Sequence, residues 1–182
     1  MAMQDKKRYI TRVFSILMGA IIPMLLAACW PTSVSFRDGS VPEEWKRFMV
    51  ETLESEAANA PISYAPELTE ELKDAIQNRV GLKLVAGEND DPQLIFSGVV
   101  RNYDVAPVAV QGDDVAAKNR LTVSASFEIF VLAPEEDVME VRANRFVDFD
   151  ANVDVGAVQA QLFEEINEQI IQDVLNKLLE NW

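Results

Sequence analysis

The sequence contains no histidine and only one cysteine, Cys29. Histidine is the usual general base near neutral pH and the commonest metal ligand, and a lone cysteine cannot form an internal disulfide bond. Glycine-rich phosphate-binding loops and Gly-x-Ser-x-Gly nucleophile motifs are absent as well. The one kind of catalysis that these absences do not exclude uses carboxylates alone. We therefore expect a protein that is not an enzyme and that holds no metal or cofactor.

Basic residues are scarce relative to acidic ones. The chain has 16 lysines and arginines against 30 aspartates and glutamates, a formal net charge of −14. Nucleic acids and anionic lipid surfaces both require a basic footprint, which this balance does not supply. An acidic chain is instead compatible with solubility and with a basic protein partner.

A long hydrophobic run is also missing. The apolar stretch of residues 13–26 has 14 residues, whereas a membrane-spanning helix needs about 20. Basic residues precede this stretch, and Ala27, Ala28 and Cys29 follow it. The alternative to a removable leader is an uncleaved transmembrane anchor, which the short length disfavours.

The order of basic, apolar and small residues before a cysteine resembles the lipobox of bacterial lipoproteins. This resemblance implies that residues 1–28 are a signal peptide that is removed. Cys29 then becomes the first residue and carries an S-diacylglycerol and an N-acyl chain such as palmitate. Several acyl chains give stable anchoring, because a single chain binds a membrane only marginally.

The mature chain that begins at Cys29 differs in charge from the whole sequence. It keeps 12 basic and 29 acidic residues, a net charge of −17. Its 154 residues fit one domain, in which about 68–70% of the unfolded surface is buried. We expect residues 29–44 to form a tether and residues 45–182 a single domain, attached to the membrane only through lipid.

Two segments alternate apolar and polar residues at the period of a β-strand. These are residues 121–131 and residues 138–149, which a turn at residues 134–137 joins into a predicted antiparallel hairpin. Residues 94–105 are apolar on both faces at their start, as in a central strand. Shorter strands are predicted at residues 34–36, 45–52 and 82–85, with Phe48, Val50 and Thr52 on one face of the second.

Two helices are predicted. Residues 66–80 begin with a proline, carry acids in the first turn and are followed by Gly81, which suits a helix end. One face of this helix is predicted to carry Leu68, Leu72, Ala75, Ile76 and Arg79. Residues 155–179 carry a wide apolar stripe. The opposite, solvent-facing side is predicted to carry Glu164, Glu165, Glu168, Asp173 and Glu180. Residues 53–65 and 106–118 are expected to be loops, with a helix over residues 53–60 as the alternative. The predicted fold class is α+β: a two-layer sandwich of a mostly antiparallel β-sheet covered by two helices, the longer one C-terminal.

One acidic segment partly matches a calcium-binding loop. Asp148, Asp150, Asn152 and Asp154 stand at the first, third, fifth and seventh positions of an EF-hand pattern. The match fails at the sixth position, where Val153 replaces glycine, and at the twelfth, where Gln159 replaces glutamate. The simpler interpretation is a strand end whose Asn152 or Asp154 caps the final helix.

The few basic residues of the mature chain give the other candidate site. Arg101, Lys118, Arg120 and Arg142 lie in or beside three predicted strands. If those strands are neighbours, Arg101, Arg120 and Arg142 can approach one another and form a local anion site within an acidic protein. The alternative is a set of solvated edge charges or ion pairs with nearby acids. Strand periodicity does not decide which of these side chains lie on the same face of the sheet.

Several short motifs follow the lipobox in the order typical of one known family. They include Ser35-Phe36, Gly39-Ser40-Val41-Pro42, Leu82-Lys83-Leu84-Val85, Phe96-Ser97-Gly98, Pro107-Val108-Ala109-Val110-Gln111-Gly112, Asn119-Arg120-Leu121-Thr122-Val123, Asp148-Phe149-Asp150, Glu165-Ile166-Asn167-Glu168-Gln169 and Asn181-Trp182. Together they resemble the divergent branch of the lipopolysaccharide-assembly lipoprotein family LptE. The resemblance covers essentially the whole mature chain.

This resemblance implies an outer-membrane lipoprotein on the periplasmic side that plugs or supports the LptD β-barrel during lipopolysaccharide delivery to the cell surface. It also implies an α/β sandwich and makes the four basic residues candidate lipopolysaccharide contacts. The net charge of −17 favours scaffold or plug action over lipid extraction. Two alternatives remain: an envelope lipoprotein that binds a small apolar ligand or another envelope component, and a calcium-dependent adhesion or carbohydrate module.

Overall fold

The computed structural model describes residues 41–108 and 117–180. All of them belong to one compact unit, Asp38–Trp182. The predicted signal peptide, Cys29, the tether as far as residue 40, the predicted strand at residues 34–36 and the middle of the predicted loop at residues 106–118 lie outside the described residues. No helix in the described ranges is long and apolar enough to cross a membrane.

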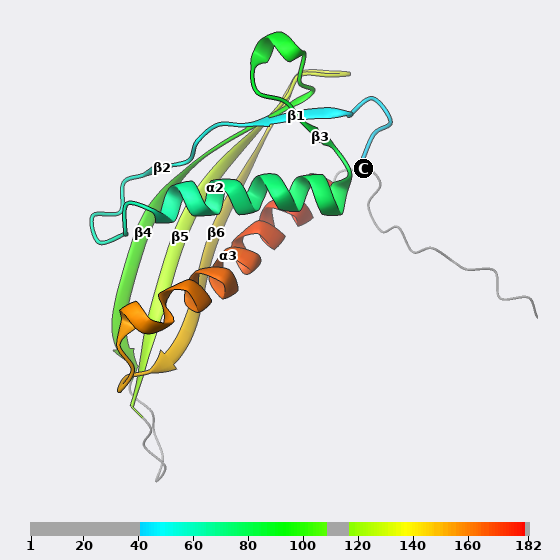
Figure 1. Cartoon of the computed structure of the whole chain (residues 1–182). Helices are drawn as coiled ribbons and strands as arrows, with labels where there is room; N and C mark the ends of the chain where they lie inside the picture. Colours follow the sequence, from blue (N-terminus) through cyan, green and yellow to red (C-terminus); the bar gives the residue numbers. More distant parts are fainter. Residues whose placement is uncertain (1–40, 109–116, 181–182) are drawn as a thin grey trace, which may run out of the picture. The chain divides into compact units, whose positions relative to one another are not determined.

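A single sheet forms one layer of this unit (Figure 1). Its strands are β1 (Arg47–Val50), β2 (Glu54–Ser55), β3 (Lys83–Leu84), β4 (Leu94–Val108), β5 (Lys118–Val131) and β6 (Asp137–Asp150). The order across the sheet is β3-β1-β4-β5-β6, with β2 beside β4. The long strands β4, β5 and β6 pair antiparallel, whereas the short strands pair parallel. The predicted hairpin and the mostly antiparallel sheet are therefore confirmed.

Both helices pack on the same face of the sheet and form the second layer (Figure 1). They are α2 (Tyr64–Ala75), which a π-helical turn η1 (Ile76–Val80) extends, and α3 (Val155–Glu180). A short 3-10 helix, η2 (Glu88–Asp90), follows β3. Gly81 ends η1 with φ +84°, a left-handed conformation that glycine adopts without strain. The predicted α+β class, with the longer helix C-terminal, is confirmed.

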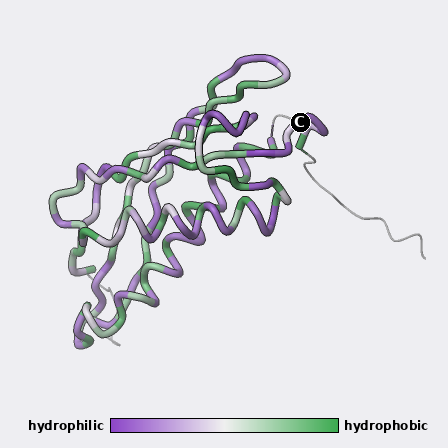
Figure 2. Tube along the Cα trace, turned by 45° about the horizontal axis from the view of Figure 1, so that its top comes forward, coloured by the Kyte–Doolittle hydropathy of each residue, from purple (hydrophilic) through white to green (hydrophobic). Residues whose placement is uncertain are grey.

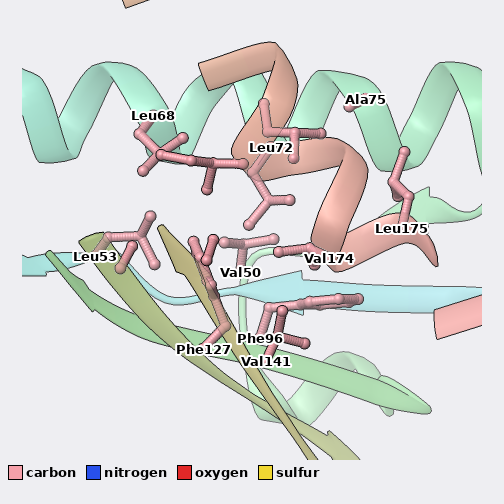
Figure 3. Close-up of a cluster of buried hydrophobic side chains, with 14 of the residues drawn as sticks. Val50, Leu53, Leu68, Leu72, Ala75, Phe96, Phe127, Val141, Val174 and Leu175 are labelled. Carbon is pink, nitrogen blue, oxygen red and sulfur yellow. The ribbon is translucent and has the colours of Figure 1, made fainter. Parts of the chain in front are cut away.

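The core lies between the two layers, and the predicted strand patterns account for most of it. Figure 3 shows Leu68 and Leu72 of α2 and Val174 of α3 above Phe96 and Phe127 of the sheet. All five side chains are almost fully buried. Figure 2 shows hydrophobic and hydrophilic segments alternating along the chain, as expected when each element has one buried face.

The segment before α2 differs from its prediction. Residues 53–65 are not all loop, because they contain β2 and the start of α2 at Tyr64. Thr52 is exposed and Leu53 is buried, so the predicted alternation in residues 45–52 ends at Val50. The physical reason is that the backbone N–H of Leu53 leaves the sheet and donates to Thr69 Oγ1 at 3.1 Å. The buried positions therefore shift by one residue between Val50 and Leu53. The chain then pairs with β4 through β2.

Other differences concern element ends and one helix face. β4 continues to Val108 and β5 begins at Lys118, so both reach into the predicted loop of residues 106–118. Arg79, predicted on the apolar face of the first helix, is exposed and pairs with Glu168 of α3, with Nη2 2.6 Å from Oε2. Its guanidinium lowers the pKa of Glu168 mainly through this hydrogen bond.

Candidate functional site on the open face of the sheet

The face of β4, β5 and β6 that points away from the helices is the candidate site, which we call the open face. Along β5 the side chains alternate, so that Ala125 and Phe127 enter the core while Ser124 and Ser126 lie on the open face. The long strands place mostly polar side chains there. The open-face residues around the centre of the sheet are Ser97, Asn102, Ser124, Ser126, Glu128, Glu140, Arg142 and Asn144.

A pocket of about 450 Å³ lies on this open face, and we call it the Arg101 pocket. Its polar side chains belong to Arg101, Ser124, Ser126, Glu128, Glu140, Arg142 and Asn144. A second hollow of about 260 Å³ adjoins it on the side of β1 and β2 and shares Arg101, Ser126 and Glu128. The two hollows together cross the sheet and have both positive and negative groups on their walls.

A β-bulge brings Arg101 to this pocket. The register of β4 against β5 shifts between Val100 and Asn102, so Arg101 is the extra residue. Its Nε donates to Ser126 Oγ at 3.1 Å, and its Nη1 pairs with Glu56 beyond β2. Arg142 is the register partner of Ser126 on β6, and it lines the same pocket as Arg101.

The ion pairs of the pocket arginines are exposed. Arg142 Nη2 is 3.3 Å from Glu140 Oε2, and the arginine side chain is 83% exposed. Exposed pairs of this kind contribute only about 0.2–1 kcal/mol each. The guanidinium groups can therefore exchange a carboxylate for an anionic or hydroxyl-bearing ligand at little cost.

Lys118 and Arg120 lie far from the Arg101 pocket. Arg120 is six residues before Ser126 on β5, a separation of about 20 Å at about 3.4 Å per residue. It instead binds Asp148 on β6 through Nε–Oδ1 (2.7 Å) and Nη2–Oδ2 (2.9 Å), with Cζ 3.8 Å from the Phe146 ring centroid. Lys118 stands opposite Asp150 at the same end. The structure thus brings together Arg101 and Arg142, but not Arg120.

The arginine pair with Asp148 also explains the acidic segment that partly matches a calcium loop. Hydrogen bonds from Arg120 lower the pKa of Asp148. Asp150 Oδ1 accepts from the backbone N–H and the side-chain amide of Asn152, at 2.8 and 2.9 Å. In the described part of the chain no group of three or more potential ligands is arranged to hold a metal ion. Asp154 directly precedes Val155, the first residue of α3, which is the position that a helix-capping residue occupies.

Arg145 does not face the same way as the pocket arginines. It occupies a core-face position of β6 and reaches α3, where its Nε donates to Asp173 Oδ2 at 2.7 Å. Asp173, predicted on the solvent face of α3, is consequently half-buried. Sequence periodicity missed this pair because a charged residue at an apolar position of a strand gives no sign of its partner on a helix.

A buried polar contact between the helices was also missed. The Tyr64 hydroxyl donates to Asn167 Oδ1 at 2.8 Å, and the Tyr64 ring packs edge-on against Tyr103 and Phe163. Burial raises the pKa of Tyr64 and also that of Tyr103. Asn167 stands within the apolar stripe of α3, four residues after Phe163. That position was the available sequence signal for a buried amide.

The chain folds as a small α+β sandwich, and solved structures share this fold. Hypothetical protein CT253 from Chlamydia trachomatis has a similar fold, with a TM-score of 0.53 at 8% identity over 75% of this chain and 99% of that one. Protein XCC0632 from Xanthomonas campestris gives 0.52 at 11% identity over 78% and 90%. No curated protein matches the sequence.

A family model matches the sequence over nearly the whole described fold. The model of the LptE family, described as lipopolysaccharide-assembly, matches residues 50–178. The protein belongs to this lipopolysaccharide-assembly family. The matched range runs from the end of β1 almost to the end of α3 and includes the complete open face. The family expected from the short motifs is thereby confirmed.

Proposed function

We propose that this protein is a lipid-anchored, non-enzymatic subunit of the lipopolysaccharide translocon. In this proposal it is held through Cys29 on the periplasmic side of the outer membrane, where it plugs or supports an LptD-like β-barrel. The family match over residues 50–178 is the observation that carries the proposal. The lipobox-like order of residues before Cys29 supports the anchor.

The surface chemistry favours support of a barrel as the main role. A mature charge of −17 disfavours contact with lipid A phosphates over most of the surface. The Arg101 pocket differs from this average, because Arg101 and Arg142 there balance the charges of Glu128 and Glu140. Direct contact with lipopolysaccharide is therefore proposed at Arg101 and Arg142. Lys118 and Arg120 are weaker candidates, because Nε and Nη2 of Arg120 already donate to the two carboxylate oxygens of Asp148.

The test of the barrel partner uses the full chain in its own membrane. The tagged protein is purified from detergent-solubilised outer membranes, and the co-purifying proteins are identified by mass spectrometry. We expect an LptD-like barrel in stable complex, and we expect depletion of the protein to lower lipopolysaccharide at the cell surface. Recovery of the protein alone, or unchanged surface lipopolysaccharide after depletion, contradicts the proposal.

The test of the pocket separates ligand contact from barrel support. Arg101→Ala and Arg142→Ala are compared with Arg79→Ala, which removes an exposed arginine that pairs between the two helices. We expect the two pocket variants to bind purified lipopolysaccharide more weakly than Arg79→Ala does, while all three co-purify with the barrel. Equal binding by the three variants would show that the pocket makes no such contact.

A further inference from the structure

Three basic residues of this acidic protein gather at the corner of the sheet where β1 and β3 begin. They are Lys46, Arg47 and Lys83, and we call this place the basic corner. Figure 1 shows β1 beside β3, and Arg47 and Lys83 are register partners on these two strands. The N–H of Lys83 donates to the carbonyl of Lys46 at 2.9 Å. Three of the 12 basic residues of the mature chain therefore occupy neighbouring backbone positions.

The two lysines of the basic corner form no ion pair with the described residues. Every arginine in residues 41–108 and 117–180 is paired with a carboxylate. Lys46 and Lys83 are exposed, and neither has such a partner in these ranges. Their ammonium groups are therefore available to a ligand without the loss of an existing pair.

A hollow of about 540 Å³ at the basic corner has a positively charged lining. Its walls carry Lys46, Arg47 and Lys83 against one acid, Glu44, so the formal balance is three minus one, or +2. An adjoining hollow and the Arg101 pocket are each lined by as many acids as bases, and the hollow beside the Arg101 pocket has more acids. The hollow at the basic corner therefore attracts anions, unlike these three.

One glutamine side chain fixes the backbone of the basic corner. Gln93 Oε1 accepts from the backbone N–H groups of Lys46 and Arg47 at 3.1 and 2.9 Å. Its Nε2 donates to the carbonyl of Asp91 at 2.7 Å, and the Asp91 carboxylate lies 2.5 Å from Arg47 Nη2. The start of β1 is thus tied to the turn before β4. Because this base is already ordered, an anion that binds there has to order only the lysine side chains.

An exposed leucine adjoins the basic corner. The N–H of Leu132 donates to the carbonyl of Gln93 at 2.8 Å, and Leu132 is 45% exposed. Basic side chains beside an exposed apolar one suit the boundary between lipid head groups and acyl chains. A soluble phosphate gains nothing from the leucine, so the combination favours a lipid surface. The turn at residues 135–137, which follows Leu132, is acidic and limits the contact to this leucine and the basic corner.

The chain enters the fold beside the basic corner. Val41 packs against the core, and the N–H of Trp45 donates to the carbonyl of Pro42 at 3.0 Å, directly before Lys46. Only the twelve residues 29–40 precede Val41 in the mature chain, and they reach at most about 40 Å when fully extended. A lipid on Cys29 therefore holds the corner close to head groups. Linkage of this kind makes a second, weak contact effectively intramolecular.

We propose that the basic corner binds the phosphate groups of anionic phospholipids in the leaflet that holds the Cys29 lipid. The mature charge of −17 disfavours broad adsorption on such a surface, so the contact is confined to the phosphates that Lys46 and Lys83 reach. The contact turns the end of the sheet at Leu132 toward the membrane and the end at Lys118 away from it. This inference rests on the lipid anchor of the proposed function and not on the barrel partner.

Lysine labelling in vesicles tests the contact. The protein, purified from membranes in detergent, is reconstituted into vesicles of phosphatidylcholine alone or of an equal mixture with phosphatidylglycerol. An amine-reactive reagent then labels the lysines, and mass spectrometry measures the rate at each one. We expect Lys46 and Lys83 to react at least about threefold more slowly in the anionic vesicles. Lys118, also exposed and without an ion pair to the described residues, lies at the opposite end of β5, about 45 Å away at about 3.4 Å per residue, and should keep its rate.

Charge variants and salt locate the contact with the same measurement. Lys46→Glu should abolish the protection of Lys83, whereas Lys118→Glu, an equal change of charge at the far end, should leave it intact. Glu44→Gln removes the acid of the hollow and should strengthen the protection. All three side chains are exposed, so the fold is preserved. Raising the salt from about 0.1 to about 1 M shortens the screening length from about 10 to about 3 Å and should remove the protection.

Equal labelling of Lys46 and Lys83 in the two kinds of vesicle, or equal protection of Lys118, overturns the proposal. Equal protection by inorganic phosphate in detergent, without phosphatidylglycerol, assigns the corner to a free anion and overturns the lipid source. Flotation with the vesicles reports the anchor separately. A protein that does not float contradicts the anchor and this inference with it, whereas a floating protein with unprotected lysines contradicts this inference alone.

Discussion

The hydroxyl of Tyr64 donates a 2.8 Å hydrogen bond to Oδ1 of Asn167, and neither side chain has any exposed surface. The bond joins the first residue of α2 to the middle of α3 across the core. Asn167 Nδ2 is buried and makes no hydrogen bond of normal geometry to the described residues, although it lies near enough to the Glu71 carboxyl to lower its pKa. The amide thus depends on Tyr64 for its one strong contact.

Removing the Tyr64 hydroxyl should destabilise the protein. We expect Tyr64→Phe to lower the free energy of unfolding by about 1–3 kcal/mol, because it leaves the buried amide of Asn167 unpaired. The double variant Y64F/N167L removes both polar groups and should be more stable than the sum of the two single changes predicts. Urea denaturation measures all three variants. Additive losses would show that the hydrogen bond does not couple the helices.

Glu71 should limit stability at neutral pH. Burial raises the pKa of this carboxyl, the Asn167 amide offsets part of the effect, and the charges of Glu67, Glu164 and Glu168 add to it. A carboxyl with a raised folded pKa stabilises the fold below its unfolded pKa, and this stability is lost as the pH rises through the folded pKa. We expect Glu71→Gln to stabilise the protein at pH 7 by up to about 1 kcal/mol, since the side chain stays partly solvated.

The pH dependence of the Glu71 variant provides its own control. The advantage of Glu71→Gln should disappear below the ordinary glutamate pKa of 4.5, where the wild-type carboxyl is also neutral. Thermal unfolding at a series of pH values measures this difference. Equal stabilisation at pH 3 and pH 7 would attribute the effect to packing and not to charge.

Gly98 should tolerate no side chain. A Cβ at this position would lie 2.7 Å from Phe127 Cδ1, 2.9 Å from Leu53 Cδ2 and 3.0 Å from the Ser126 carbonyl oxygen. We expect Gly98→Ala to cost about 1–3 kcal/mol, because overpacking displaces neighbours that are themselves buried. Gly87→Ala is the matched control, since nothing lies within 4 Å of its Cβ. Similar chemical denaturation curves for the two variants would contradict this account of the contact of Gly98 with Leu53 and β5.

The Arg120–Asp148 pair should be visible in a titration. Arg120 lowers the pKa of Asp148 from its ordinary value of 3.8, mainly by hydrogen bonding. A carboxyl with a lowered folded pKa gives stability above its unfolded pKa, and this stability is lost as the pH falls through the folded pKa. In Arg120→Ala we expect NMR to show the Asp148 pKa rising toward its ordinary value, with a small loss of stability at pH 7 that vanishes in strong acid. An unchanged Asp148 titration would contradict the pairing.

The lipid anchor is tested at Cys29, which lies outside the described residues. Cys29→Ala removes the thiol that the lipobox-like motif assigns to the diacylglyceryl group, so we expect the variant to incorporate no radiolabelled fatty acid in cells. Immunoblotting checks that the variant is produced at a normal level. Fatty-acid labelling that persists in Cys29→Ala would exclude this cysteine as the acceptor.

Local patterning was enough to predict the long elements. The alternation in residues 121–131 and 138–149 gave β5 and β6 and their antiparallel pairing, because each strand has one face in the core. The wide apolar stripe of residues 155–179 gave α3 to within one residue at its end. The break at Thr52 and Leu53 was not predictable from this period, since it depends on Thr69 of a helix that follows later in the chain.

The sequence by itself determined the α+β class, the family and the acidic balance of this protein, because these depend on local periodicity, motif order and composition. Only the tertiary structure decided which charges meet. A one-residue bulge turned Arg101 toward Ser126 and Arg142, while the strand register kept Arg120 with Asp148 at the other end of the sheet. Likewise, only the packing of α2 on α3 paired Tyr64 with Asn167. Bulges, registers and helix contacts are set by long-range packing, for which a sequence period carries no signal.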